Sequence, residues 1–352
     1  MRWDSLAVAA DDVPAAPPLV RLSSLLRSVR PPEFDGITFH EVLAKSALNH
    51  VPVTSRMLPG AWTINPYRGC SHACLYCYAR NTHRYLDLNT GADFDSQIVV
   101  KVNVAEVLAR ELSTKKELPE KVALGTNTDP YQRAEGRYGL MPGIITALGG
   151  RRVPFSILTK GTLLRRDLPL LTSVAEHCDV NLALSIAIFD DALQRSLEPG
   201  TPTTAARLAT VTMIRERGLR CAVFLAPVLP GLTDSPAQLD QALAMIKEAG
   251  ATEVFFTALR LGPDVKEWFL GWLSRERPDL VDRYRELYGA GSSVPDGFRQ
   301  LLSARMSSLL QRHGLRNASD RRSAEGRESA AGFSLDRRRA VAAPLVEQPQ
   351  LF

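Results

Sequence analysis

Apolar and polar positions alternate in blocks between residues 62 and 261. Six short apolar runs predict strands at Trp62–Tyr67, Lys121–Thr126, Phe155–Thr159, Val180–Ile188, Cys221–Val228 and Glu253–Leu261. Between them, apolar residues recur at helical spacing and predict helices at Leu75–Leu88, Val104–Leu112, Pro142–Leu148, Arg166–His177, Thr204–Arg217 and Pro236–Ala249. Strands that are apolar on both faces indicate a parallel sheet covered by helices. Right-handed crossovers would curl this sheet into a barrel or most of one.

The chain before this block has a different composition. Residues 1 to 33 are rich in Ala, Pro, Ser and Arg and predict a flexible leader, with a short helix at Leu19–Val29. The stretch Phe34–Val53 predicts a strand followed by an amphipathic helix that Pro52 ends. We therefore expect the folded core to span residues 34 to 262.

Beyond residue 262 the alternation of strands and helices stops. Three amphipathic stretches predict a helical extension over residues 263 to 315, with helices at Val265–Leu273, Pro278–Tyr288 and Phe298–His313. Residues 316 to 352 are polar, with arginines interleaved among acids, and predict a disordered tail.

Composition limits the class of protein. A hydrophobic content of 45% over 352 residues is ample for one large α/β domain with appendages. No apolar run approaches the ~20 residues of a membrane span, so we expect no membrane insertion. Cys178 and Cys221 stand alone in apolar surroundings, which indicates reduced thiols and a cytoplasmic location. The net charge of +5 permits nucleic-acid binding without arguing for it.

Candidate chemistry is concentrated in one short segment. Cys70, Cys74 and Cys77 place three of the five cysteines within eight residues, with the spacing C-x3-C-x2-C, after a glycine that allows a tight turn. Thiolates are preferred ligands of soft metals and iron–sulfur clusters. Since a cluster normally takes four cysteines, three leave one iron open to a small molecule. The alternative is a zinc site completed by His72 or a distant ligand, but zinc motifs usually come as two pairs and a second pair is missing.

Polar side chains stand at several predicted strand ends, where β/α barrels carry their function. Thr126 ends the second strand and Thr128 follows it. Lys160 directly follows the third strand, where its ammonium would point into the open end of the barrel towards a carboxylate. Ser185 lies in the apolar fourth strand, so its hydroxyl needs a ligand or a backbone carbonyl as partner. Ala226 begins a turn of prolines and glycine that lets backbone approach a flat ligand.

The segment Asn65–Arg80 reads NPYRGCSHACLYCYAR. With an aromatic residue, Tyr76, directly before the last cysteine, it resembles the signature of the radical S-adenosylmethionine (SAM) superfamily. The wider wording, together with Arg195–Pro199 and Arg207, is similar to the spore-photoproduct-lyase-like branch, often called DNA-repair-photolyase-like proteins. The resemblance implies a lyase-like enzyme with an α/β fold, a partial (β/α)6 TIM-type barrel followed by the helical C-terminal extension.

The resemblance also implies the cofactors. A [4Fe–4S] cluster would be bound by Cys70, Cys74 and Cys77, and SAM would chelate the open iron through its amine and carboxylate. An electron donor of the flavodoxin or ferredoxin type would reduce the cluster, which would cleave SAM to methionine and a 5′-deoxyadenosyl radical. The implied SAM contacts are Tyr76, Tyr78, Thr126, Thr128, Lys160, Ser185 and Ala226.

One departure concerns the substrate. The enzyme that names this branch has a cysteine near the end of the second strand, which returns a hydrogen atom to the product radical. Thr126 stands at about that place, and no cysteine lies between Cys77 and Cys178. Thymine-dimer reversal by that route is therefore not expected here. By resemblance alone, the first substrate hypothesis is still a nucleic acid, for DNA lesion repair or base modification. The alternatives are a peptide, protein or small metabolite, or a non-catalytic iron–sulfur protein.

The chain ends in a short motif of its own. Gln348, Leu351 and Phe352 resemble the peptide by which bacterial repair proteins dock on the replication sliding clamp, although Pro349 replaces the usual leucine. Two terminal apolar side chains suit insertion into a hydrophobic groove. We therefore expect the sliding clamp as a partner.

Overall fold

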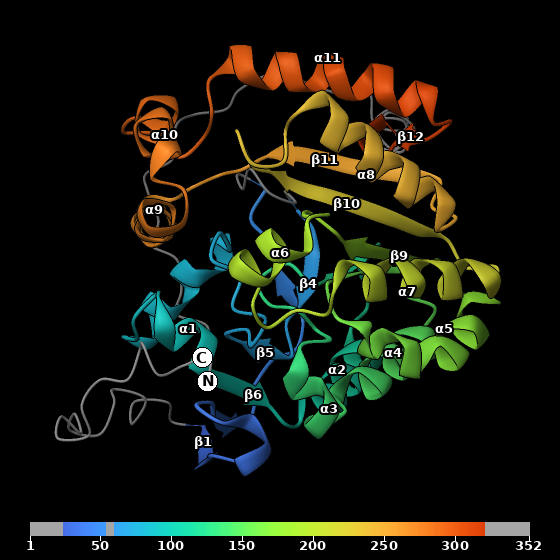
Figure 1. Ribbon diagram of the computed structural model, residues 1–352. Coiled ribbons are helices and arrows are strands. Elements are labelled where there is room, and N and C mark those ends of the chain that lie inside the picture. The colour runs from blue at the N-terminus through green and yellow to red at the C-terminus, as the bar shows by residue number, and fades with distance from the viewer. Residues whose placement is uncertain (1–23, 54–59, 321–352) are drawn as a thin grey trace, which may run out of the picture.

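The main sheet has eight strands in the order β12-β11-β10-β9-β8-β7-β4-β3 (Figure 1). The computed structural model describes residues 24–53 and 60–320 of the chain. β3 is antiparallel to β4, and the other neighbouring pairs in this sheet are parallel. The strands are β3 (Asn49–His50), β4 (Trp62–Ile64), β7 (Val122–Leu124), β8 (Phe155–Thr159), β9 (Val180–Ser185), β10 (Cys221–Val228), β11 (Glu253–Ala258) and β12 (Arg316–Asn317).

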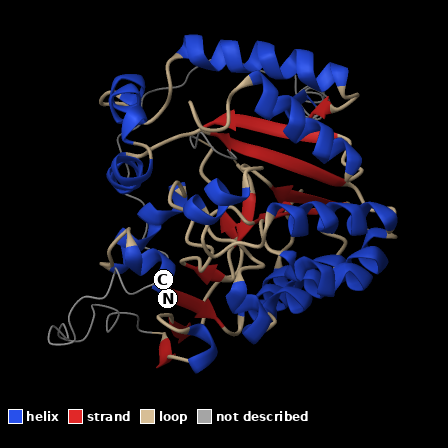
Figure 2. Cartoon of the chain, in the orientation of Figure 1, coloured by secondary structure: helices blue, strands red, loops and turns tan. Residues whose placement is uncertain are grey.

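Strands β4 and β7 to β11 follow one another in the sheet in chain order, and helices connect them (Figure 2). The edge strands β3 and β12 do not pair with each other, so the sheet is an open, partial barrel. This confirms the predicted α/β architecture. The principal connecting helices are α2 (Val104–Thr114), α4 (Leu140–Gly150), α5 (Leu168–Ala175), α7 (Thr204–Glu216) and α8 (Pro236–Glu248).

The centre of the sheet is buried on both faces, which parallel strands require. Leu182, Leu184 and Val223 on neighbouring strands are at most 2% exposed. α5 packs on β9 and α7 on β10, so the apolar faces of these helices close the outer side. Further short helical segments are η2 (Pro32–Phe34), α1 (Ala92–Ser96), α3 (Arg133–Tyr138), η4 (Thr162–Asp167), α6 (Asp191–Leu197) and η5 (Pro278–Leu280).

A second, four-stranded sheet has the order β1-β2-β6-β5. Its strands are β1 (Leu25–Val29), β2 (Thr38–Val42), β5 (Tyr67–Arg68) and β6 (Gln97–Lys101). One face, with Phe39, Ile98 and Val100, belongs to the main core. On the other face Val42 and Val99 pack against Leu86 of η3 (Tyr78–Leu86). This sheet was not expected, because nothing in the pattern of residues 97 to 101 shows which strand will pair with them.

Several local predictions were wrong. Leu25–Val29 form a strand that pairs with β2, where a helix was expected; residues 19 to 23 lie outside the described chain. β2 is present in Phe34–Val53, but a loop and β3 replace the amphipathic helix. The expected strand Trp62–Tyr67 is broken at Pro66, which lacks the N–H a ladder needs, into β4 and β5. Strand pairing over long separations overrides local propensity here.

The three helices of the C-terminal extension are confirmed as α9 (Pro263–Glu276), α10 (Val281–Tyr288) and α11 (Asp296–Arg312). α11 lies along α8, and α9 packs on η3 (Figure 1). α9 is also joined to α6, since the Trp272 indole donates to the Ser196 hydroxyl at 2.8 Å. β12 falls within the segment predicted to be a disordered tail, and residues 321 to 352 lie outside the described chain. In the part described, no helix combines the length and apolarity needed to cross a membrane.

We predict that Leu184→Ala destabilises the protein by about 2–5 kcal/mol, because it opens a cavity between fully buried strands. Leu301→Ala is the matched control, since Leu301 is 58% exposed on α11. We expect the control to change the free energy of unfolding by less than about 0.5 kcal/mol. Urea unfolding followed by circular dichroism measures both; equal effects would contradict the assigned core.

Candidate active site

The cysteine loop, residues 69 to 77, starts at a glycine that the backbone requires. Gly69 has φ of +85°, and a Cβ there would lie 3.0 Å from the Phe94 carbonyl. The Thr128 hydroxyl donates to the Gly69 carbonyl at 2.8 Å, and the Gln132 amide donates to the same oxygen at 3.0 Å. The Gln132 side-chain oxygen in turn accepts the Ser71 N–H at 2.8 Å. The segment that follows β7 therefore fixes the start of the loop.

The loop is held from the other side by the segment that follows α6. The Leu75 N–H donates to the Leu197 carbonyl at 3.0 Å, and the Gly200 N–H donates to the His72 carbonyl at 3.0 Å. A Cβ at Gly200 would lie 2.0 Å from the Ser71 carbonyl oxygen, so only glycine permits this approach. Two segments far apart in the sequence thus clamp the cysteine loop.

The three thiols lie close enough to influence one another. Cys70 and Cys74 are buried, Cys77 is half-buried, and none forms a disulfide. Burial raises the pKa of Cys77 to about 11, and the charge of Cys70 adds to the shift. Burial likewise raises the pKa of Cys74, with contributions from both other cysteines. Such thiols are neutral on their own and become thiolates when a metal binds.

This donor set fits an iron–sulfur cluster. It consists of three soft sulfur donors from a single rigid loop, which is the ligand type such clusters require. Within the described residues, no three His, Cys, Asp or Glu side chains are arranged as ligands of one metal ion. His72, the alternative zinc ligand, points its Nδ1 at Asp129 Oδ2, 3.2 Å away, and also interacts with Cys70.

Asp129 connects the end of β8 to the cysteine loop. Its Oδ2 accepts the Lys160 N–H at 2.6 Å, and its Oδ1 accepts the Tyr131 N–H at 2.9 Å and the Thr159 hydroxyl. Burial alone would raise the pKa of Asp129, but the neighbouring His72 outweighs it and holds that pKa below its usual value. Asp129 is therefore an ionised support at this end of the sheet.

Lys160, directly after β8, points into the centre of the strand ends. Its ammonium donates to the Ser185 hydroxyl at 2.9 Å, to Glu198 Oε1 at 2.9 Å and to the Tyr76 hydroxyl at 3.2 Å. The Tyr76 hydroxyl also donates to Glu198 Oε1. Burial raises the pKa of Cys74, and the Lys160 charge works against this shift. Through Tyr76 the ammonium is bonded to the cysteine loop itself.

Glu198 and Arg207 complete this network. Both side chains are fully buried, and Arg207 Nη2 lies 2.7 Å from Glu198 Oε2. Burial works to raise the pKa of Glu198, but Arg207 and then Lys160 lower it to about 2. One carboxylate between two cations leaves a net positive charge, which suits a bound carboxylate group.

The structure brings most of the predicted contacts together. Tyr76, Lys160 and Ser185 meet directly, and the Ser185 hydroxyl lies 3.5 Å from the Ala226 carbonyl. The Tyr78 hydroxyl donates to the Thr126 carbonyl at the end of β7. Thr128 lies apart from them, buried beneath Gly69 as a support of the cysteine loop. The tail residues Gln348, Leu351 and Phe352 fall outside the described chain.

Sequence reasoning did not assign the supporting residues Asp129, Gln132, Gly200, Glu198 and Arg207. Glu198 and Arg207 belong to the residues that resemble the family, but nothing in the local pattern shows that both are fully buried. The sequence around Glu198 is polar, so it carries no local signal that this side chain would be buried.

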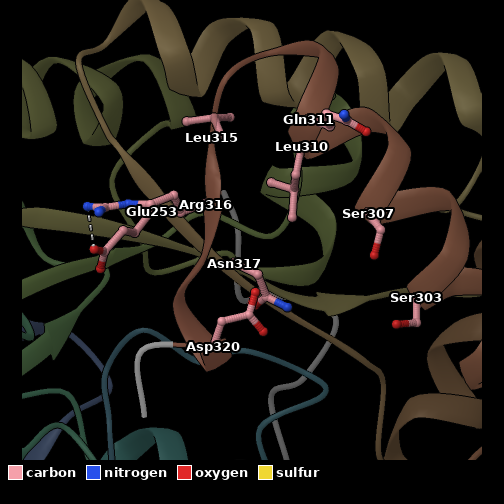
Figure 3. Close-up of a pocket in the computed structure, with 9 residues that line it drawn as sticks. All are labelled: Glu253, Ser303, Ser307, Leu310, Gln311, Leu315, Arg316, Asn317 and Asp320. Carbon is pink, nitrogen blue, oxygen red and sulfur yellow. Dashed lines mark hydrogen bonds and ion pairs between the residues drawn. The ribbon is translucent and has the colours of Figure 1, made fainter. Parts of the chain in front are cut away.

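Two cavities lie outside this network. One of about 360 Å³ borders the outer side of the cysteine loop, lined among others by His72, Tyr131, Gly161 and Gly200. A larger one of about 730 Å³ lies between α11 and β12, with Ser303, Ser307 and Asn317 on its wall (Figure 3). It is lined by Glu253 at the start of β11, whereas the cysteine loop lies at the ends of the strands. Its polar side chains do not connect with the cysteine loop.

Comparison with known proteins identifies the family. A model described as the radical SAM superfamily matches residues 64–258, more than half of the chain. The chain belongs to the radical SAM superfamily. It is therefore an enzyme of the radical SAM type, and the superfamily implies a [4Fe–4S] cluster and SAM as its cofactors.

Relatives of similar sequence include uncharacterised proteins. One from Mycobacterium tuberculosis (strain H37Rv) is 55% identical over 335 residues, which are 94% of this chain and 97% of that protein. One from Methanocaldococcus jannaschii is 29% identical over 184 residues, 52% of this chain and 66% of that protein.

Solved structures of spore photoproduct lyase share the fold. A cysteine-to-alanine variant with dinucleoside spore photoproduct has a TM-score of 0.59 and 17% identity, covering 89% of this chain and 88% of that chain. A variant with bound AdoMet and the same dinucleoside has a TM-score of 0.57 and 16% identity, covering 79% and 81%. At this identity the likeness shows the radical SAM fold.

We predict that Glu198→Gln destabilises the cluster-free protein by about 3–5 kcal/mol, because it leaves the buried Arg207 without a counter-charge. Glu33→Gln is the control, since Glu33 pairs with Arg137 at the surface, where both side chains are more than a third exposed. We expect the control to cost less than about 1 kcal/mol. Urea unfolding gives both values, and equal losses would refute the role of the buried charge.

Proposed function

We propose that this chain binds a [4Fe–4S] cluster through Cys70, Cys74 and Cys77 and cleaves SAM reductively in the cytoplasm. The observation that carries the proposal is the meeting of the cysteine loop with the strand ends of the partial barrel, where the Lys160 ammonium bonds Tyr76 of the loop together with Ser185 and Glu198. When bound, the cluster supplies the electron that cleaves SAM to methionine and a 5′-deoxyadenosyl radical, which abstracts hydrogen from the substrate.

The protein's part is to hold SAM and keep water away. Lys160 would pair with the SAM carboxylate, because Lys160 and Arg207 together carry two positive charges and Glu198 neutralises only one of them. Ser185 and Tyr76 would fix the ammonium in place, and the backbone at Ala226 would face the adenine. Tyr76 is 6% exposed and Glu198 is fully buried, so the charges act in a site of low dielectric.

We propose a nucleic acid as the substrate class, for lesion repair or base modification. The support is the fold shared with spore photoproduct lyase bound to its dinucleoside. The enzyme's reductant would be a donor of the flavodoxin or ferredoxin type. A peptide or metabolite substrate, or a cluster kept without turnover, is the alternative.

Binding to the sliding clamp through Gln348, Leu351 and Phe352 is a separate proposal, which deletion of the last two residues would test.

We predict that the reconstituted, reduced protein converts SAM to 5′-deoxyadenosine and that Cys74→Ala lowers the rate at least about a hundredfold, because the loop then lacks a cluster ligand. The assay is anaerobic chromatography of the products, with iron and sulfide content measured alongside. Cys221→Ala is the matched control, since Cys221 is buried in β10 away from the loop.

A stable cluster that never cleaves SAM, with or without added nucleic acid, would favour the non-catalytic alternative. Zinc in place of iron would overturn the proposal altogether. Loss of iron in the Cys221 variant would show that any buried cysteine matters and that the triad is not specific.

We predict that Lys160→Met weakens SAM binding to the oxidised, cluster-loaded protein by about ten- to a hundredfold, the loss of one charge-assisted hydrogen bond at a partly buried site. Equilibrium dialysis with labelled SAM measures this directly. Lys121→Met, at the other end of β7, removes the same charge as a control. Unchanged affinity in Lys160→Met would contradict the carboxylate-binding role.

A further inference from the structure

Two cations share the outer face of the small sheet. β5 and β6 are antiparallel, with Arg68 opposite Val99. Because side chains alternate along a strand, Lys101 lies on the same face as Val99, diagonal to Arg68. Diagonal neighbours of this kind are about 7–8 Å apart, within reach of two long side chains. We call these two residues the Arg68–Lys101 pair.

Within the described part of the chain, this pair forms no ion pair of the kind that buried or half-buried cations usually have. Among the residues described, neither side chain has a hydrogen bond or an ion pair. Burial first, and then the charge of Arg68, lower the pKa of Lys101 to about 8. Glu111 opposes this shift, but its carboxylate is already held by the N–H groups of Ala47 and Leu48. A bound anion would relieve the repulsion between the two cations.

An exposed aromatic side chain lies on the helix that covers this face. Tyr85 lies on η3, which covers this face through Leu86, and it is 70% exposed. It is within electrostatic reach of the Arg68 guanidinium. At the other end of η3, Tyr78 is 45% exposed and its hydroxyl contacts the Thr126 carbonyl at the mouth. Seven residues of a 3-10 helix span about 14 Å, a distance of a few nucleotides.

We propose that the Arg68–Lys101 pair binds a backbone phosphate of a single-stranded nucleic acid while Tyr85 stacks on a base, so that a nearby nucleotide reaches the mouth at Tyr78. The combination of cations that track the backbone and an aromatic platform for a base is the chemistry of single-strand binding. A free phosphate or an acidic protein would use the cations but not the exposed ring. The proposal rests on the proposed substrate class and assigns it a surface.

The test is fluorescence anisotropy of labelled 12-residue single-stranded DNA and RNA with the reconstituted full chain, over a range of salt. Lys101→Met should weaken binding about five- to tenfold and reduce the slope of log affinity against log salt by about 0.7, the loss of one phosphate contact. Tyr85→Ala should weaken it about tenfold, whereas Tyr85→Phe, which keeps the ring, should bind within about twofold of the parent. Arg68 is left unchanged, because it lies two residues from Cys70.

Lys121→Met is the control for charge, and it should bind as the parent does. Parent-like affinity and salt slope in both Lys101→Met and Tyr85→Ala would overturn the proposal. A second result would also overturn it: polyglutamate or inorganic phosphate competes as effectively, per charge, as the unlabelled oligonucleotide does, and Tyr85→Ala binds like the parent. Iron content and 5′-deoxyadenosine formation are measured on every variant. A parent that cleaves SAM but binds no oligonucleotide refutes this proposal and the nucleic-acid substrate, and leaves SAM cleavage standing.

Discussion

Glu198 carries a negative charge in a place that water does not reach, and the site is arranged so that this charge is balanced. Arg207 and Lys160 approach its two oxygens from different sides. Arg207 also donates to the Ser185 carbonyl at 3.0 Å, so the same arginine fixes the end of β9. Two residues further along, Gly200 contacts the cysteine loop. The strand ends and the loop are therefore positioned by one connected set of buried charges, in which the loss of Glu198 would leave two cations without compensation.

The network leaves one excess positive charge at the strand ends, and the proposed pairing with the SAM carboxylate rests on it. Arg207 is fully buried against Glu198, whereas the Lys160 side chain is 13% exposed. Lys160 is therefore the cation of the network that a ligand can reach. Identity of 16–18% to solved structures of the same fold leaves room for different substrates.

The sequence alone was sufficient for the repeating part of the fold and for the ligand loop. Six apolar strands with intervening helices are a local signal repeated many times, and the spacing of Cys70, Cys74 and Cys77 is readable without tertiary information. The small sheet was not readable, because residues 38 to 42 and 97 to 101 become strands by pairing with each other over more than fifty residues. The same holds for Glu198 and Arg207, whose roles depend on burial. For Thr128 the local pattern predicted a contact with SAM, whereas in the structure its hydroxyl bonds the Gly69 carbonyl and supports the cysteine loop.

The pairing of β5 with β6 links the cysteine loop to the N-terminal part of the chain. β5 ends two residues before Cys70, and β6 joins it to β2 and through β2 to β1. The residues that match the family model begin at 64, so they include β5 and β6 but leave out the strands on the far side. A fragment trimmed to the family boundaries would carry an exposed sheet edge immediately beside its ligand loop. The sheet that holds the cysteine loop therefore extends beyond the residues that match the family model.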